Sequence, residues 1–177
     1  MGKFLAQYHD ALQRAKQEGR QIRVGAVVID SEGRYLILGR SIGQARGKDG
    51  ELVDVMSHEL PSGRAYEHDS LETATLRNVH RETGLNLPVE AVLGYLAHFD
   101  YEFKFLRGPG KKTQFNFVVD AGKDPQVNTE VNQIAKKKRG FSWLNPIDFN
   151  SNGYHLSPET KGILTLPKIE QILALRK

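Results

Sequence analysis

The sequence has no cysteine among its 177 residues, which excludes disulfides and thiolate chemistry. No apolar run approaches the roughly 18–20 residues that a membrane-spanning helix requires. Residues 1–10 lack the apolar core of a secretory signal, and Ala6 stands where a myristoylation signal needs Ser or Thr. These absences predict a cytoplasmic protein with no membrane partner.

A large excess of one charge is also lacking. The chain has 25 Lys and Arg residues against 21 Asp and Glu residues, and its formal net charge is +4. That excess suits a polyanionic ligand, but many soluble proteins share it, so charge selects no function. Hydrophobic residues make up 39% of the chain, enough for one globular core. We therefore expect 1–177 to be a single domain.

Hydrophobic spacing predicts how the first part of the chain folds. Apolar residues at helical spacing predict an amphipathic helix over residues 3–18, ending at Gly19. Two apolar runs rich in strand-forming residues, 22–29 and 35–38, flank the glycine-containing segment 30–33. This arrangement is typical of a β-hairpin.

The rest of the chain alternates between apolar runs and segments rich in glycine, proline or charge. Ser157 followed by Pro158 is typical of a helix start, and Pro167 divides the C-terminal helical region in two. We expect strands at 52–56, 89–106, 114–120 and 141–143, and loops at 41–51, 108–112 and 121–140.

The most specific pattern lies in residues 63–85, which read G-R-A-Y-E-H-D-S-L-E-T-A-T-L-R-N-V-H-R-E-T-G-L. They resemble the Nudix box, G-x5-E-x7-R-E-U-x-E-E-x-G-U, where U is a bulky apolar residue, and every spacing is kept. Asp69 stands where the box has Glu, and Asn78 and Arg81 stand where it has two further glutamates. The matching positions are Gly63, Arg77, Val79, Glu82, Gly84 and Leu85.

The resemblance extends beyond the box. Residues 59–62 are similar to the E-x-P-G that leads into it, and residues 141–146 are similar to the family's late W-x-x-P strand end. The resemblance implies a Nudix-type α/β/α sandwich with a mixed β-sheet, of class α/β. It implies a core at 20–150, with an N-terminal helical extension at 1–19 and a C-terminal helical segment at 151–177.

The box itself predicts a helix. Asp69 and Glu72 have the form of a capping box, in which Asp69 is the N-cap and Glu72 reaches back to its amide. Apolar residues from Leu71 to Val79 form a stripe suited to a core, and Gly84 is typical of a C-cap.

The resemblance also implies a hydrolase of nucleoside diphosphates linked to another group, with Mg²⁺ or Mn²⁺ offsetting charge on the phosphate oxygens. In the family, the positions of Asn78, Arg81 and Glu82 hold glutamates on one helix face, two of which are replaced here. An amide oxygen of Asn78 is a weaker magnesium ligand than a carboxylate, and Arg81 opposes cation binding. Any metal site is therefore expected to be weak.

The ligands that remain for such a metal are few. They are Glu82 and a main-chain carbonyl of Ser62 or Gly63, with Glu59 or Glu67 as substitute acids. Glu82 is alternatively the ion-pair partner of Arg77, which commonly fixes the box helix in the family. The residues His58, His68 and His80 lie near the box without the spacing of a zinc site.

A basic run, Lys136-Lys137-Lys138-Arg139, occupies the late loop where many family members carry an acid. It is either a solvated loop or a direct contact for the phosphates of a nucleotide or of RNA. The resemblance places this loop at the rim of the ligand cleft.

Three functions remain open at this point. The first is a Mg²⁺-dependent hydrolase with Arg77, Asn78, Arg81 and Glu82 at its catalytic site, weakened by the loss of two glutamates. The second is a non-catalytic protein that binds a nucleotide or RNA, and the third is a structural or partner-binding role. The sequence does not identify which diphosphate compound is the ligand. It also does not decide between a monomer and a homodimer.

Overall fold

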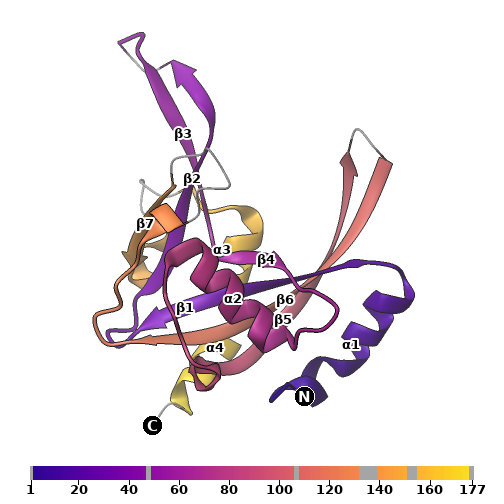
Figure 1. Cartoon of the computed structure of the whole chain (residues 1–177). Coiled ribbons are helices and arrows are strands. Elements are labelled where there is room, and N and C mark those ends of the chain that lie inside the picture. Colours follow the sequence, from indigo (N-terminus) through magenta and orange to yellow (C-terminus); the bar gives the residue numbers. More distant parts are fainter. Residues whose placement is uncertain (1, 47–48, 106–107, 132–138, 151–154, 176–177) are drawn as a thin grey trace.

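The computed structural model describes residues 2–46, 49–105, 108–131, 139–150 and 155–175. Within these ranges, seven strands form one mixed sheet (Figure 1). The strands are β1 (Gln21–Asp30), β2 (Tyr35–Arg46), β3 (Leu52–Glu59), β4 (Ser62–Arg64), β5 (Val92–Phe105), β6 (Gly108–Gly122) and β7 (Arg139–Leu144).

The order of the sheet is β3-β2-β1-β6-β5, with β4 paired to β1 and β7 paired to β2. Strand β1 runs parallel to β6, and its pairings with β2 and β4 are antiparallel. The sequence of β1 suits this central position, because the run 24–29 is apolar apart from one glycine. The last seven residues of the strand are buried.

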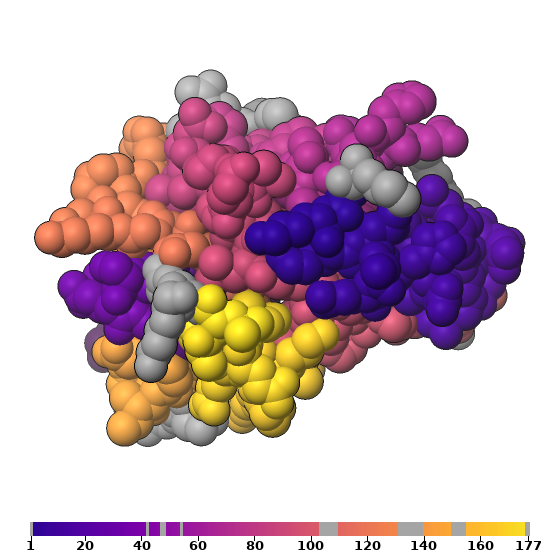
Figure 2. Space-filling model, turned by 90° about the horizontal axis from the view of Figure 1, so that it is seen from below, coloured from indigo at the N-terminus to yellow at the C-terminus, as the bar shows by residue number. Residues whose placement is uncertain are grey.

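Helices cover both faces of the sheet. They are α1 (Leu5–Gln17), α2 (Leu71–Thr83), α3 (Pro158–Leu164) and α4 (Lys168–Ala174), with the short 3-10 helices η1 (Val89–Ala91), η2 (Thr129–Val131) and η3 (Pro146–Asn150). Helix α1 packs with α2 on one face, and α3 and α4 pack on the other; the view from below in Figure 2 shows α1 in indigo and the C-terminal helices in yellow. None of the helices in the described ranges is long and apolar enough to cross a membrane.

Two hydrophobic clusters hold the layers together, and β1 contributes to both. Val24, Ala26 and Val28 pack with the apolar residues of α1 and α2, whereas Val27 and Ile29 pack with those of α3 and α4. This alternation follows from the two-residue period of a strand. The expected α/β/α sandwich with a mixed sheet is confirmed.

Several predicted elements agree with the structure. The helix expected over 3–18 is α1, and the hairpin expected around segment 30–33 is β1 and β2. Gly84 ends α2 with φ of 73°, a left-handed conformation that glycine adopts without strain. Ser157 caps α3, and Pro167 separates α3 from α4.

The loop predicted at 108–112 is wrong, because these residues belong to β6. The loop predicted at 41–51 is wrong for residues 41–46, which continue β2, whereas residues 49–51 lie outside the strands. The loop predicted at 121–140 is wrong at its ends, which belong to β6 and β7. At 41–46 and at 108–112 the chain forms a two-stranded ribbon that extends beyond the body of the sheet (Figure 1). Residues 43–46 are exposed, so a glycine-rich, polar sequence is compatible with strand pairing there.

The expected capping box is also wrong. Ser70 is the N-cap of α2, and its side chain accepts a hydrogen bond from the Thr73 amide at 3.1 Å. Glu72 is only 1% exposed and accepts hydrogen bonds from the Phe4 amide at 2.9 Å and the Tyr8 hydroxyl at 3.0 Å. Local spacing could not reveal this role, because the partners of Glu72 lie more than 60 residues away in the chain.

Glu72 therefore joins α1 to α2, and its removal should destabilise the fold. Burial and the Glu72 carboxylate both raise the pKa of Tyr8, so the hydroxyl remains a donor. We expect Glu72→Ala to lower the free energy of unfolding by about 2–4 kcal/mol, because two hydrogen bonds to a buried carboxyl are lost. Urea denaturation measures this change.

The matched control is Glu90→Ala, which removes an exposed glutamate from η1. We expect that control to shift the unfolding free energy by about 0.5 kcal/mol or less. Equal effects of the two substitutions would contradict the role given to Glu72.

Candidate functional site

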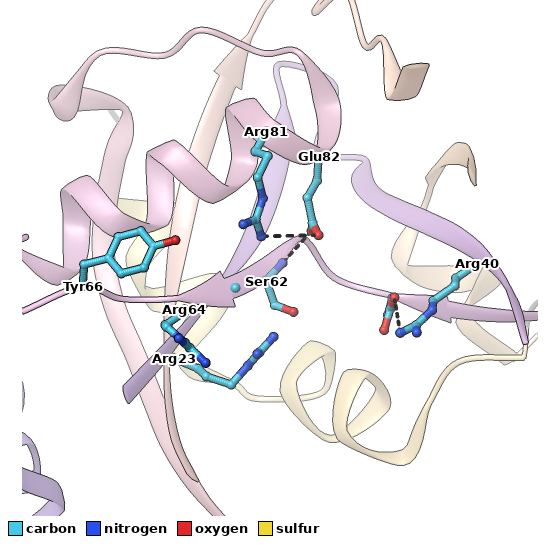
Figure 3. Close-up of a pocket in the computed structure, with 9 residues that line it drawn as sticks. Arg23, Arg40, Ser62, Arg64, Tyr66, Arg81 and Glu82 are labelled. Atoms are coloured by element: carbon cyan, nitrogen blue, oxygen red, sulfur yellow. Dashed lines mark hydrogen bonds and ion pairs between the residues drawn. The ribbon is translucent and has the colours of Figure 1, made fainter. Parts of the chain in front are cut away.

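A cleft of about 350 Å³ lies where β1, β4 and α2 meet (Figure 3). We call it the arginine pocket because four arginines and two glutamates line it. Its lining residues are Arg23, Arg40, Glu59, Ser62, Gly63, Arg64, Tyr66, Arg81 and Glu82.

Strand pairing and one glycine assemble this pocket. Strand β4 pairs with β1 so that Arg64 lies opposite Arg23 and Gly63 lies opposite Val24. A Cβ atom on Gly63 would lie 1.8 Å from Oδ1 of Asn78 on α2. Only glycine permits an approach this close, so the first glycine of the box brings β4 against the helix.

Glu82 connects the helix to β4. One carboxylate oxygen accepts a hydrogen bond from the Ser62 amide at 2.9 Å, and the other lies 4.0 Å from Nη2 of Arg81 (Figure 3). The Glu82 residue is 7% exposed. Glu82 thus joins two elements of the pocket, and its carboxylate lies beside the guanidinium of Arg81.

Asn78 has a structural position rather than a position in the cleft. It is 2% exposed, and its amide nitrogen donates to the Ala74 carbonyl at 2.8 Å and to the Arg64 carbonyl at 3.2 Å. The Asn78 side chain on α2 therefore supplies a hydrogen-bond donor to the Arg64 carbonyl of β4. It is not among the residues that line the described pocket.

Arg77 pairs with Asp69, and it also donates to the Arg64 carbonyl at 3.0 Å. The expectation that Glu82 is the partner of Arg77 is therefore wrong. The two residues are five positions apart along α2, which places them about 140° apart around the helix axis. Asp69, expected as the N-cap, instead holds this arginine.

The two substitute acids have different positions. Glu59 lines the pocket, with its carboxylate 3.8 Å from Nη1 of Arg40. Glu67 is exposed in the segment before α2 and is not among the lining residues. Glu59, Glu82, Ser62 and Gly63 are brought together as the sequence pattern suggested, and Glu67 is not.

Three of the pocket's arginines were missed by the sequence reasoning: Arg23, Arg40 and Arg64. The sequence does indicate that Arg23 is unusual, because it is a single arginine within the apolar run 22–29, and an arginine rarely lies in a buried strand without a function or a partner. Burial lowers the pKa of Arg23, and the Glu82 carboxylate opposes that effect. Among the described residues, no hydrogen bond or ion pair of the Arg23 guanidinium occurs.

A second cavity of about 610 Å³, the side chamber, adjoins the arginine pocket. Burial lowers the pKa of its Lys112, and Arg23 and Arg64 lower it further. Its lining residues include four that it shares with the pocket; the full set is Arg23, Arg40, Glu59, Leu60, Ser62, Tyr101, Lys112, Gln114, Ser157, Glu159, Thr160 and Ile163.

The donors present do not fit the divalent cation that the family pattern implies. Asn78 directs an amide nitrogen at carbonyls, and Glu82 and Glu59 each lie beside an arginine. Across the described ranges, no group of three or more His, Cys, Asp or Glu side chains is placed to hold a metal. The charge that faces the cleft is mainly cationic.

The basic run falls mostly outside the described residues, because Lys136, Lys137 and Lys138 are not among them. Arg139 begins β7, and its backbone is paired with Arg40 of β2. The chain that follows the run therefore enters the sheet beside a residue of the arginine pocket.

Comparison with known proteins agrees with this architecture. The family profile of the NUDIX domain matches residues 19–160. A search of curated proteins found no match.

Among solved structures, the chain is similar to the MutT protein of Methanosarcina mazei, with 20% identity, a TM-score of 0.54, and coverage of 89% of this chain and 96% of that one. It is similar to the MutT Nudix hydrolase of Burkholderia pseudomallei, with 16% identity, a TM-score of 0.56, and coverage of 84% and 98%. It is also similar to the Nudix hydrolase RenU of M. smegmatis, with 18% identity, a TM-score of 0.54, and coverage of 88% and 87%.

At these identities the structural similarity shows a shared fold. The family match covers most of the chain, and its limits enclose the whole sheet, the box helix and the arginine pocket. This chain is therefore a member of the Nudix family.

Proposed function

We propose that this protein binds the diphosphate group of a nucleotide-type ligand in the arginine pocket, and that arginines replace metal ions as the source of positive charge. The observation that carries the proposal is the charge of the cleft. Four arginines face it, and each of its two glutamates already lies beside one of them.

Arginine is suited to this role. A guanidinium group presents planar, paired donors that match the oxygens of a phosphate, and it stays charged when partly buried. Arg23 supports the proposal most directly, because its guanidinium reaches the pocket without a hydrogen bond or ion pair to the described residues. A bound diphosphate would satisfy its donors and reduce the repulsion among neighbouring cations.

The side chamber supports a ligand that extends beyond the diphosphate. Its volume of about 610 Å³ lies within the range of small-molecule sites. Leu60 and Ile163 supply apolar surface, and Gln114 and Glu159 supply polar groups. We propose that a second group, linked to the diphosphate, lies there. The run 136–139 is proposed to add further phosphate contacts from the late loop.

A second candidate, a weakened hydrolase, is favoured by one observation. Glu82 lies at the pocket together with Glu59 and the main chain of Ser62 and Gly63, the remaining donors for Mg²⁺ or Mn²⁺. For a cation to bind there, Glu82 would have to exchange its contacts with the Ser62 amide and Arg81. Binding without cleavage is therefore the better supported function.

The proposal predicts that a chelator does not abolish ligand binding. Calorimetric titration of inorganic pyrophosphate should detect binding in EDTA, because the arginines contact the phosphates directly. Added Mg²⁺ should not strengthen this binding, since a cation on the ligand reduces its charge. Binding that occurs only when Mg²⁺ or Mn²⁺ is present would contradict the proposal and favour the hydrolase.

A substitution of Arg23 should weaken that binding. We expect Arg23→Gln to lower pyrophosphate affinity by about ten- to a hundredfold, because hydrogen bonds to charged groups contribute about 1.5–3 kcal/mol. The remaining binding should depend less on salt, whose screening length falls from about 10 Å at 0.1 M to about 3 Å at 1 M. Titrations at several salt concentrations measure both effects.

Arg46→Gln is the matched control, because Arg46 is an exposed arginine of β2 that lines neither cavity. It should leave pyrophosphate affinity nearly unchanged. If both variants bind alike, general positive charge accounts for the affinity and the pocket does not.

Restoring the box glutamates should not restore hydrolysis. In the double variant Asn78→Glu, Arg81→Glu, a carboxylate at position 78 would face the carbonyls of Ala74 and Arg64, which now accept from an amide. We expect the unfolding free energy to fall by about 1–3 kcal/mol. Turnover of a panel of nucleoside diphosphate derivatives should stay at background.

The single variant Arg81→Glu keeps both Asn78 hydrogen bonds and should unfold at a urea concentration closer to that of the unmodified protein. A double variant with turnover of roughly 1 s⁻¹ or more would instead show that only the acids were missing.

A further inference from the structure

An aromatic side chain, that of Tyr66, lies among the charged groups of the arginine pocket. Tyr66 lies between β4 and α2, lines the pocket and is 54% exposed. Figure 3 shows its ring at one end of the pocket, with the hydroxyl directed toward the side where Arg81 and Ser62 lie. It is the aromatic residue of the pocket's lining within the described chain.

The ring is held from one side. The guanidinium of Arg77 lies 4.4 Å from the ring centroid of Tyr66, within the range of a cation–π contact. Arg77 is itself fixed by its ion pair with Asp69 and by its hydrogen bond to the Arg64 carbonyl. The main chain of Tyr66 is held as well, since its amide donates to Asp69 at 3.4 Å.

Two residues at box positions, Arg77 and Asp69, therefore support this ring. A ring held on one face and open to solvent elsewhere has already lost part of its conformational freedom, so stacking on it costs less entropy. Aromatic side chains beside cationic grooves are the usual surfaces on which nucleic-acid bases stack. The cations here are Arg64 and Arg81, which line the same pocket.

We infer that Tyr66 is a stacking platform for the base of a nucleoside diphosphate whose phosphates lie among the pocket's arginines. This inference rests on the proposed function and narrows it. The ligand would carry an aromatic ring on one side of its diphosphate, which excludes diphosphate esters of non-aromatic alcohols as the preferred class. A group on the other side of the diphosphate would extend into the side chamber.

Tyr101 is the matched alternative, because it is the aromatic residue that lines the side chamber. It differs from Tyr66 in being half-buried, and its pKa is raised by burial and by Glu159. We expect the ring of Tyr66, and not that of Tyr101, to make the protein bind a nucleoside diphosphate more tightly than a plain diphosphate.

The experiment compares two probes, ADP and inorganic pyrophosphate, by calorimetry on the full chain. Tyr66→Leu should weaken ADP binding by about tenfold, the size of effect that one stacked base contributes, and should leave pyrophosphate binding nearly unchanged. Tyr66→Phe retains the ring and should keep the affinity for ADP. Tyr101→Leu should leave the ratio of the two affinities unchanged.

The outcomes separate this inference from the proposed function. If Tyr66→Leu weakens both probes equally, Tyr66 only supports the pocket, and the inference is overturned while diphosphate binding stands. If Tyr101→Leu removes the preference for ADP, the base lies in the side chamber and the inference is again overturned. If the unmodified protein binds neither probe, the proposed function fails together with the inference.

Discussion

The close approach of β4 to α2 is the constraint on which the site depends. Gly63 permits the approach because a side chain there would overlap Asn78. The hydrogen bond from the Ser62 amide to Glu82 and the donation from Asn78 to the Arg64 carbonyl then hold the strand against the helix. Because β4 is also paired with β1, the same contact brings Arg23 of β1, Arg64 of β4 and Arg81 of α2 to one cleft.

The replacements in the box have a coherent electrostatic effect. In the family pattern, acids at positions 78 and 81 attract cations, and the cations attract phosphate. Here Asn78 is buried against main-chain carbonyls, while Arg81 contributes its charge to the pocket directly. The scaffold of the box is thus retained through its glycines and its helix, and we propose that guanidinium groups supply the attraction for phosphate.

The sequence predicted what depends on local pattern, and it missed what depends on tertiary contact. The sandwich followed from the family resemblance, and the helix α2 and its end at Gly84 followed from the spacing of residues in the box. The hydrogen bonds that Glu72 accepts from Phe4 and Tyr8 could not be predicted, because these partners are distant in the chain. The position of Arg23 in the pocket depends on the register of β1 with β4, and the role proposed for Tyr66 depends on the contact of its ring with Arg77.

The most direct test is a crystal structure of the protein grown with ADP and Mn²⁺, with data collected at the manganese absorption edge. The account predicts that the diphosphate contacts Arg23 and Arg81 and that no anomalous peak occurs beside Glu82. A manganese peak bridging Glu82 and the phosphates would contradict the account, because the cation and not the arginines would then hold the ligand.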